Sequence, residues 1–146
     1  MNSSRIRAAL IAVAAISVAT AGVLQGATSS KVPPRKPKTH VVQMITQDGK
    51  QVFDPVNLKI QQGDTVEWLA VSGSHNVAFW ADSVPKGAVD FLRKAMPDTT
   101  APLTSPRKPT KGDKIVMVFN GMPKGEYKYY CTPHLKKMMI GELTIQ

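Results

Sequence analysis

Short stretches of alternating apolar and polar residues, separated by turn residues, follow one another through most of the chain after residue 40. Alternation with a period of two places the apolar side chains on one face, which is typical of a β-strand that covers a core. About seven such strands are expected, over residues 41–46, 51–53, 57–60, 65–68, 115–119, 126–131 and 143–145. Short strands at this spacing predict an all-β fold, and in particular a Greek-key β-sandwich.

One segment departs from the strand pattern. Residues 89–96 are expected to form two helical turns that end before Pro97. Pro102, Pro106 and Pro109 then favour a loop in the segment that follows. The sandwich is therefore expected to carry one short helix within a long loop.

The first 27 residues have the layout of an export signal. Arg5 and Arg7 precede an uncharged stretch over residues 8–24, and small residues follow, so that cleavage is expected after Ala21 or Ala27. The alternative is an uncleaved anchor, but a stretch of 17 residues is short for a full membrane span. We expect residues 1–27 to be a signal peptide that is removed. The protein would then reach the periplasm or another extracytoplasmic space, such as a thylakoid lumen.

Residues 28–39 are interpreted as a basic tether, which could end at a membrane if the signal were retained. They contain three prolines and four basic residues, a composition that stays extended. The whole chain has 19 basic and 10 acidic residues and a net charge of +9, but six of the basic residues precede residue 40. Residues 40–146, the expected folded domain, are thus only mildly basic and show no basic stripe interleaved with aromatic residues. Nucleic acid is not expected as a partner.

Cys131 is the single cysteine of the chain. Small exported domains usually carry cysteines in disulfide pairs, so a lone thiol is buried and inert, reactive, or bound to a metal. His134, Met138 and Met139 lie within the next eight residues. A thiolate, an imidazole and a thioether form a soft ligand set that suits a copper ion cycling between its two oxidation states. A further ligand would have to come from another histidine, His40 or His75.

The strand expected over residues 126–131 orients the cysteine. Because successive side chains of a strand point to opposite faces, Tyr127, Tyr129 and Cys131 share one face and Tyr130 lies on the other. With the two other tyrosines facing the interior, Cys131 enters the end of the sandwich. Pro133 stiffens the turn that follows, which lets a histidine next to it return toward the sulfur.

These motifs resemble those of the cupredoxins, and specifically the plastocyanin and pseudoazurin branch of these type 1 blue copper proteins. Cys131-Thr132-Pro133-His134, followed after four residues by Met139, is similar to the Cys-x2-His-x4-Met pattern of that branch. Residues 75–79 (His-Asn-Val-Ala-Phe) resemble the segment that carries the family's first copper histidine, and residues 140–145 resemble its closing strand. The similarity covers residues 40–146, including the framework residues Phe53, Pro55, Leu58, Ile60, Gly63, Asp64, Val66 and Trp68.

The resemblance implies a cupredoxin-like sandwich that holds one copper ion, Cu+ or Cu2+, through four ligands. His75 and His134 would supply imidazole nitrogens, Cys131 the thiolate and Met139 a long axial thioether. Met138 is the alternative to Met139, but the four residues that separate Met139 from the second histidine favour Met139.

The resemblance also assigns a supporting role to residues around the ligands. Asn76 is expected to tie the two ligand segments together, and Pro133 to stiffen the ligand loop. His40 is expected to be a surface or strand-start residue, Met117 a core residue and Met122 a turn residue.

The function that the resemblance implies is transfer of single electrons between redox proteins. Catalysis is not expected, since a filled set of four ligands leaves no open position for a substrate. The ring edge of His134 would be the electron port and Tyr130 a second exit. Lys136 and Lys137 lie beside the port, either as solvated loop residues or as docking groups for a partner with an acidic rim. We expect a monomer; the competing interpretation is a copper-binding or chaperone cupredoxin without a carrier role.

Overall fold

The computed structural model describes residues 35–146, and these residues belong to one compact unit. The expected signal peptide and the first part of the expected tether lie outside the described residues. Between residues 35 and 146, no helix has the length and apolar character needed to cross a membrane.

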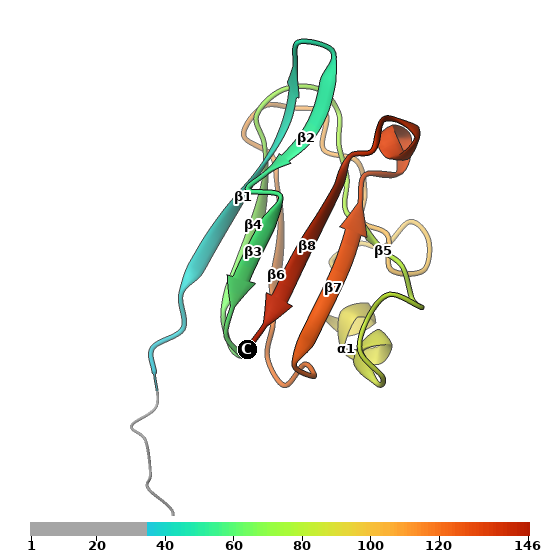
Figure 1. Cartoon of the computed structure of the whole chain (residues 1–146). Coiled ribbons are helices and arrows are strands. Elements are labelled where there is room, and N and C mark those ends of the chain that lie inside the picture. The colour runs from blue at the N-terminus through green and yellow to red at the C-terminus, as the bar shows by residue number, and fades with distance from the viewer. Residues whose placement is uncertain (1–34) are drawn as a thin grey trace, which may run out of the picture. The chain divides into compact units, whose positions relative to one another are not determined.

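Two four-stranded sheets make up the body of the domain (Figure 1). The strands are β1 (Thr39–Gln47), β2 (Lys50–Asp54), β3 (Asn57–Ile60), β4 (Thr65–Ala70), β5 (Ala78–Phe79), β6 (Lys114–Val118), β7 (Gly125–Tyr130) and β8 (Ile140–Ile145). One sheet has the strand order β2-β1-β4-β6, and the other has the order β3-β8-β7-β5. The pairs β1–β4 and β3–β8 are parallel, whereas the other pairs are antiparallel. The predicted all-β sandwich with one short helix is confirmed.

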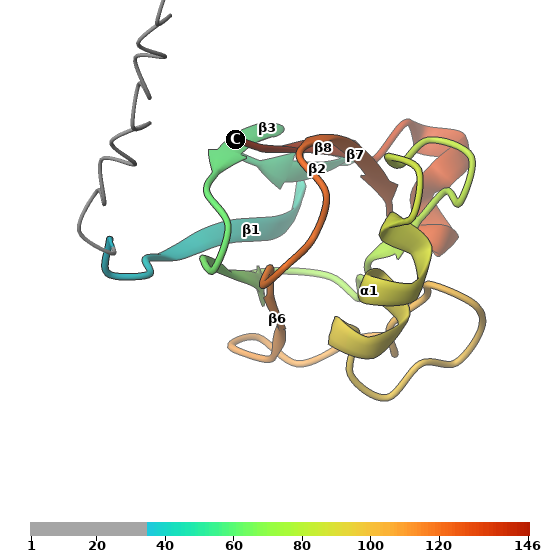
Figure 2. The ribbon, with the colours of Figure 1, turned by 90° about the horizontal axis from the view of Figure 1, so that it is seen from below.

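The core lies between the two sheets and consists of the inward-facing positions of the alternating strands. Seen from below, β3, β8 and β7 lie in one layer and β1 and β6 in the other (Figure 2). The fully buried Trp68 on β4 has its ring centroid 5.5 Å from that of Tyr129 and 6.3 Å from that of Phe79, both edge-to-face. Each such aromatic pair contributes about 0.5–1.5 kcal/mol beyond the burial of its surface. This cluster joins the two sheets close to the strand that leads into Cys131.

The helix α1 (Ala88–Ala95) lies in the long connection between β5 and β6, within one residue of the prediction. Two other elements differ from expectation. The two-residue strand β5 is too short to show a period of two in the sequence, and so it was missed. The segment after Cys131, expected to be a turn, forms the 3₁₀-helix η1 (Thr132–Lys137), in which Pro133 occupies the first turn.

Buried Asp64 fixes the start of the domain. Its carboxylate accepts hydrogen bonds from the Arg35 guanidinium and from the Lys38 backbone N–H (2.8 Å), and lies 2.9 Å from His40 Nε2. Burial alone would raise the pKa of Asp64, but these hydrogen bonds hold it well below its usual range. Residues 35–39 are therefore held against the domain, although the sequence pattern placed them in the tether. His40 lies in β1, as expected, and outside the cluster of potential metal ligands.

Candidate metal centre

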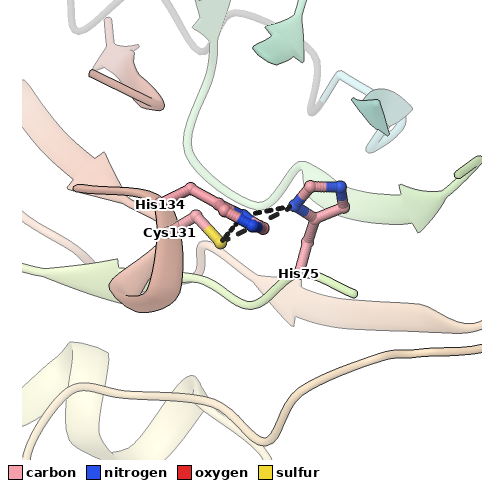
Figure 3. A group of neighbouring side chains, drawn as sticks. All are labelled: His75, Cys131 and His134. Carbon is pink, nitrogen blue, oxygen red and sulfur yellow. Dashed lines mark hydrogen bonds between the residues drawn. The ribbon is translucent and has the colours of Figure 1, made fainter. Parts of the chain in front are cut away.

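Three side chains from separate segments converge at one end of the sandwich (Figure 3). His75 lies between β4 and β5, Cys131 directly follows β7, and His134 belongs to η1. Cys131 Sγ is 3.4 Å from His134 Nδ1 and 3.7 Å from His75 Nδ1, and the two Nδ1 atoms are 3.1 Å apart. Each of the three residues thus offers one ligand atom, and these three atoms all lie within 4.8 Å of one another.

These separations fit a single metal ion. Ligands at the roughly 2.0–2.3 Å typical of imidazole and thiolate bonds to a tetrahedral ion stand about 3.3–3.6 Å from one another. On the opposite side of its ring, His75 Nε2 lies 2.8 Å from the backbone carbonyl oxygen of Ser72. Because a carbonyl can only accept, Nε2 carries the proton and Nδ1 keeps a lone pair that faces the other two residues.

Burial keeps the two histidines in the neutral form that binds metals. His75 and Cys131 are fully buried, and His134 is half-buried. Burial lowers the pKa of both histidines, and the nearby Arg107 charge acts in the same direction. Burial raises the pKa of the Cys131 thiol, while backbone hydrogen bonds from Asn76 and His134 oppose this rise. A bound cation would shift this thiol to the thiolate.

The two methionines that follow His134 differ sharply in their surroundings. Met139 is fully buried, whereas Met138 is 73% exposed. The Cys131 N–H donates to the Met139 carbonyl (3.1 Å), and the Met139 N–H donates to the His134 carbonyl (3.3 Å). The structure therefore holds the Met139 backbone against the segments of the other candidate ligands and leaves the Met138 side chain in solvent, and Met139 as the fourth ligand stays a prediction.

Comparison with known proteins identifies the family. The model of the copper binding proteins of the plastocyanin/azurin family matches residues 40–146. The chain belongs to this family. It is 37% identical over 113 residues to a plastocyanin of Synechococcus sp. (strain JA-2-3B'a(2-13)), a match that covers 77% of this chain and 76% of that protein.

Solved structures of the same family share the fold. The oxidized form of plastocyanin from Dryopteris crassirhizoma matches with a TM-score of 0.54 and 26% identity over 73% of this chain and 100% of that chain. A pseudoazurin from Sinorhizobium meliloti matches with a TM-score of 0.52 and 25% identity over 75% of this chain and 74% of that chain. Copper is therefore the cofactor of this cupredoxin, and the cluster of His75, Cys131 and His134 is its candidate site.

Asn76 joins three segments of the cupredoxin around this site. Its Oδ1 accepts hydrogen bonds from the Thr132 backbone N–H (2.9 Å) and hydroxyl (3.1 Å), and its Nδ2 donates to the Ser105 carbonyl (3.2 Å). Asn76 is only 2% exposed, so water has little access to these bonds. The Asn76 side chain thus links the His75 segment, the loop of residues 131–139 and the loop that precedes β6. Pro133 lies exposed at the start of η1.

Tyr130 lies on the outer face of β7, as the alternation predicts, but it is half-buried rather than free. Its ring stacks on that of Trp80, with a centroid separation of 4.2 Å and an interplanar angle of 25°. Sequence reasoning assigned no role to Trp80. The signal that could have found it is the pairing of β5 with β7, in which Ala78 stands opposite Tyr130, but β5 itself was not recognised.

Positive charges surround the exposed side of the site. Lys136 and Lys137 lie exposed on η1. Arg107, which sequence reasoning missed, is exposed and close enough for its charge to act on all three clustered side chains. The next residue, Lys108, exchanges two backbone hydrogen bonds with His75, at 2.7 and 3.4 Å. The loop has no periodic pattern, so nothing in the sequence indicated that it lies beside His75.

Proposed function

We propose that this cupredoxin carries single electrons between redox proteins, with one copper ion bound by His75 Nδ1, His134 Nδ1, Cys131 Sγ and Met139 Sδ. The observation that carries the proposal is the convergence of two imidazoles and a thiol in a buried cluster, with buried Met139 in the same loop. Copper in such a site supplies a centre that alternates between the cuprous and cupric states. A filled ligand set favours a carrier over an enzyme, because no position remains for a substrate.

Rigid ligand segments suit this function. Electron transfer is fast when the ligands move little between oxidation states, and the hydrogen bonds around the site restrain each ligand segment. Asn76 fixes the start of the ligand loop, the backbone of Met139 is bonded to Cys131 and His134, and Lys108 is bonded to His75. These contacts support a site whose geometry is set by the fold.

Among the proposed ligands, His134 is the one that reaches solvent. It is half-buried, whereas the other three proposed ligands are fully buried. We therefore propose the His134 ring edge as the electron port. Tyr130, adjacent to Cys131 along the chain and stacked on Trp80, is proposed as a second exit.

Lys136 and Lys137 are proposed as docking groups for a partner with an acidic rim. Both are exposed on the same short helix as His134, and the exposed Arg107 adds a third positive charge near the site. Charges at the rim of a transient interface raise the association rate more than the affinity. The export signal expected in residues 1–27 supports a carrier in an extracytoplasmic space, and we propose that this carrier is a monomer.

The competing function is copper delivery or storage, which uses the same soft ligands but requires a site that exchanges its metal. The burial of Cys131 and Met139 favours the carrier. Optical absorption and electron paramagnetic resonance spectra of the copper-loaded protein, with Cys131→Ser as control, test the proposal. We expect an intense blue band from cysteine-to-copper charge transfer that disappears in the variant. Weak absorption that is the same in both proteins would contradict the proposed carrier.

A further inference from the structure

The ring of His75 has a second set of contacts on the side that faces away from Cys131. Nε2 lies 2.8 Å from the Ser72 carbonyl oxygen and 3.2 Å from Thr46 Oγ1. Thr46 is close to the end of β1, so it reaches the ring from a strand that contributes no ligand.

The direction of the Thr46 hydroxyl proton follows from its other partner. Thr46 Oγ1 donates to Gln51 Oε1, and Gln51 stands opposite Thr46 in the β1–β2 ladder. Because the hydroxyl proton is directed at the Gln51 carbonyl oxygen, a lone pair of Thr46 Oγ1 is left to accept from His75 Nε2–H. Two acceptors, one carbonyl and one hydroxyl, therefore share the proton on Nε2.

The groups around Thr46 and His75 Nε2 are hydrogen-bonded to one another and packed too tightly to admit a further atom. Gln51 is 7% exposed, an uncommon burial for a polar side chain at a strand end. Thr46 N donates to Ser72 Oγ (2.8 Å), and Ser72 Oγ donates back to the Thr46 carbonyl (2.9 Å). At Gly73 a Cβ atom would stand 2.2 Å from Thr46 Oγ1 and 2.9 Å from His75 Nε2, and the backbone has a φ of +81°. Only glycine fits there.

We infer that Thr46 and Gln51 are positioning residues that hold His75 with its proton on Nε2 and make Nδ1 a stronger donor to copper, which favours the cupric state. The inference rests on the proposed copper site. A hydrogen bond to the far nitrogen of a ligating histidine fixes its tautomer and ring orientation and raises its basicity. The Ser72 acceptor is a backbone carbonyl, which a substitution does not remove. Thr46 is therefore the residue whose side chain can change how strongly His75 Nδ1 donates to copper.

Thr46→Val tests the inference, because valine keeps the shape of threonine and removes the acceptor. Loss of such an outer partner typically costs about 10- to 100-fold in metal affinity, and the Ser72 carbonyl that still accepts from Nε2 favours the lower end. We expect the ratio of cupric to cuprous affinity to fall by about tenfold, which raises the reduction potential by about 59 mV. Thr46→Ser, which retains the hydroxyl, should restore the wild-type potential. Thr144→Val on β8, several residues along the strand from the ligand loop, is the matched control and should leave the potential unchanged.

A second measurement needs no copper. In the metal-free protein, nitrogen-15 NMR of His75 should show a protonated Nε2, and the Nε2 proton should exchange with solvent faster in Thr46→Val than in the wild type. Gln51→Leu keeps the Thr46 hydroxyl but removes the acceptor of its proton, so the oxygen is no longer held as an acceptor for His75. This variant should likewise raise the reduction potential and speed the exchange of the Nε2 proton. It also provides the test should Thr46→Val fail to fold.

The results separate the inference from the proposed function. A wild-type protein without the charge-transfer band would refute the proposed carrier, whereas the proton exchange of metal-free His75 would still decide the positioning role. The inference is overturned when Thr46→Val, or Gln51→Leu in its place, changes both the potential and the exchange rate by no more than the Thr144→Val control.

Discussion

Replacing Asn76 with alanine should destabilise the metal-free protein by on the order of 3 kcal/mol. The variant loses three hydrogen bonds, two accepted from Thr132 and one donated to Ser105. Thr132 is exposed, so water can replace part of its loss, and each of these bonds is worth about 0.5–1 kcal/mol. Ser105 is fully buried, and without Asn76 its carbonyl keeps only the longer hydrogen bond from the Thr100 hydroxyl (3.5 Å), so this loss costs about 1–3 kcal/mol.

Urea unfolding of the metal-free protein at neutral pH measures this loss. Asn57→Ala is a suitable control, because Asn57 is exposed on β3 and the same atoms are removed. We expect the midpoint to fall strongly for Asn76→Ala and hardly at all for the control, with an unchanged denaturant slope. A loss below about 0.5 kcal/mol, comparable to ordinary surface substitutions, would refute the view that Asn76 clamps the ligand segments.

Three further predictions concern charge and packing. The folded pKa of Asp64 lies below its unfolded value of about 3.9, so the ionised carboxylate stabilises the fold above pH 3.9, and this contribution is lost as the pH falls through the folded pKa. Asp64→Asn should therefore lower the free energy of unfolding by on the order of 2 kcal/mol at pH 7 and by clearly less at pH 3. An equal loss at both pH values would contradict the lowered pKa of Asp64. Gly141→Ala should lower the free energy of unfolding by about 1–3 kcal/mol, because the new Cβ would stand 2.4 Å from the buried Tyr129 ring. An unchanged melting temperature would contradict this prediction and show that the Tyr129 ring can shift to admit the Cβ. The rate of association with an acidic redox partner, followed by stopped-flow, should fall with added salt, and replacing Lys136 and Lys137 with glutamine should weaken this salt dependence. Faster electron transfer at high ionic strength would argue against docking through these lysines.

Local patterns in the sequence were sufficient to predict the sandwich and to bring together three of the four proposed ligands. Alternation predicts the strands because it reflects the burial of one face, and in β7 it correctly placed Tyr127 and Tyr129 inside and Tyr130 outside. Cys131, His134 and Met139 lie within one loop, so their proximity follows from the chain itself. His75 is distant in sequence, and its place beside Cys131 came only from the resemblance to the cupredoxins.

The contacts that position the site could not be predicted, because they join segments without periodicity. The pairing of Lys108 with His75 and the bond from Asn76 to Ser105 depend on the path of a proline-rich loop. The pairing of Arg35 with Asp64 depends on a basic stretch whose composition indicates only a linker. In both cases the tertiary structure supplies partners that the local sequence does not specify.

The central claim is that four named side chains bind one copper ion. Anomalous diffraction at the copper absorption edge from crystals of the copper-loaded protein tests it most directly. We predict a single strong peak in contact with His75 Nδ1, His134 Nδ1 and Cys131 Sγ, with Met139 Sδ at a longer distance. A peak outside this cluster, or one approached by Met138 while Met139 points away, would contradict the account.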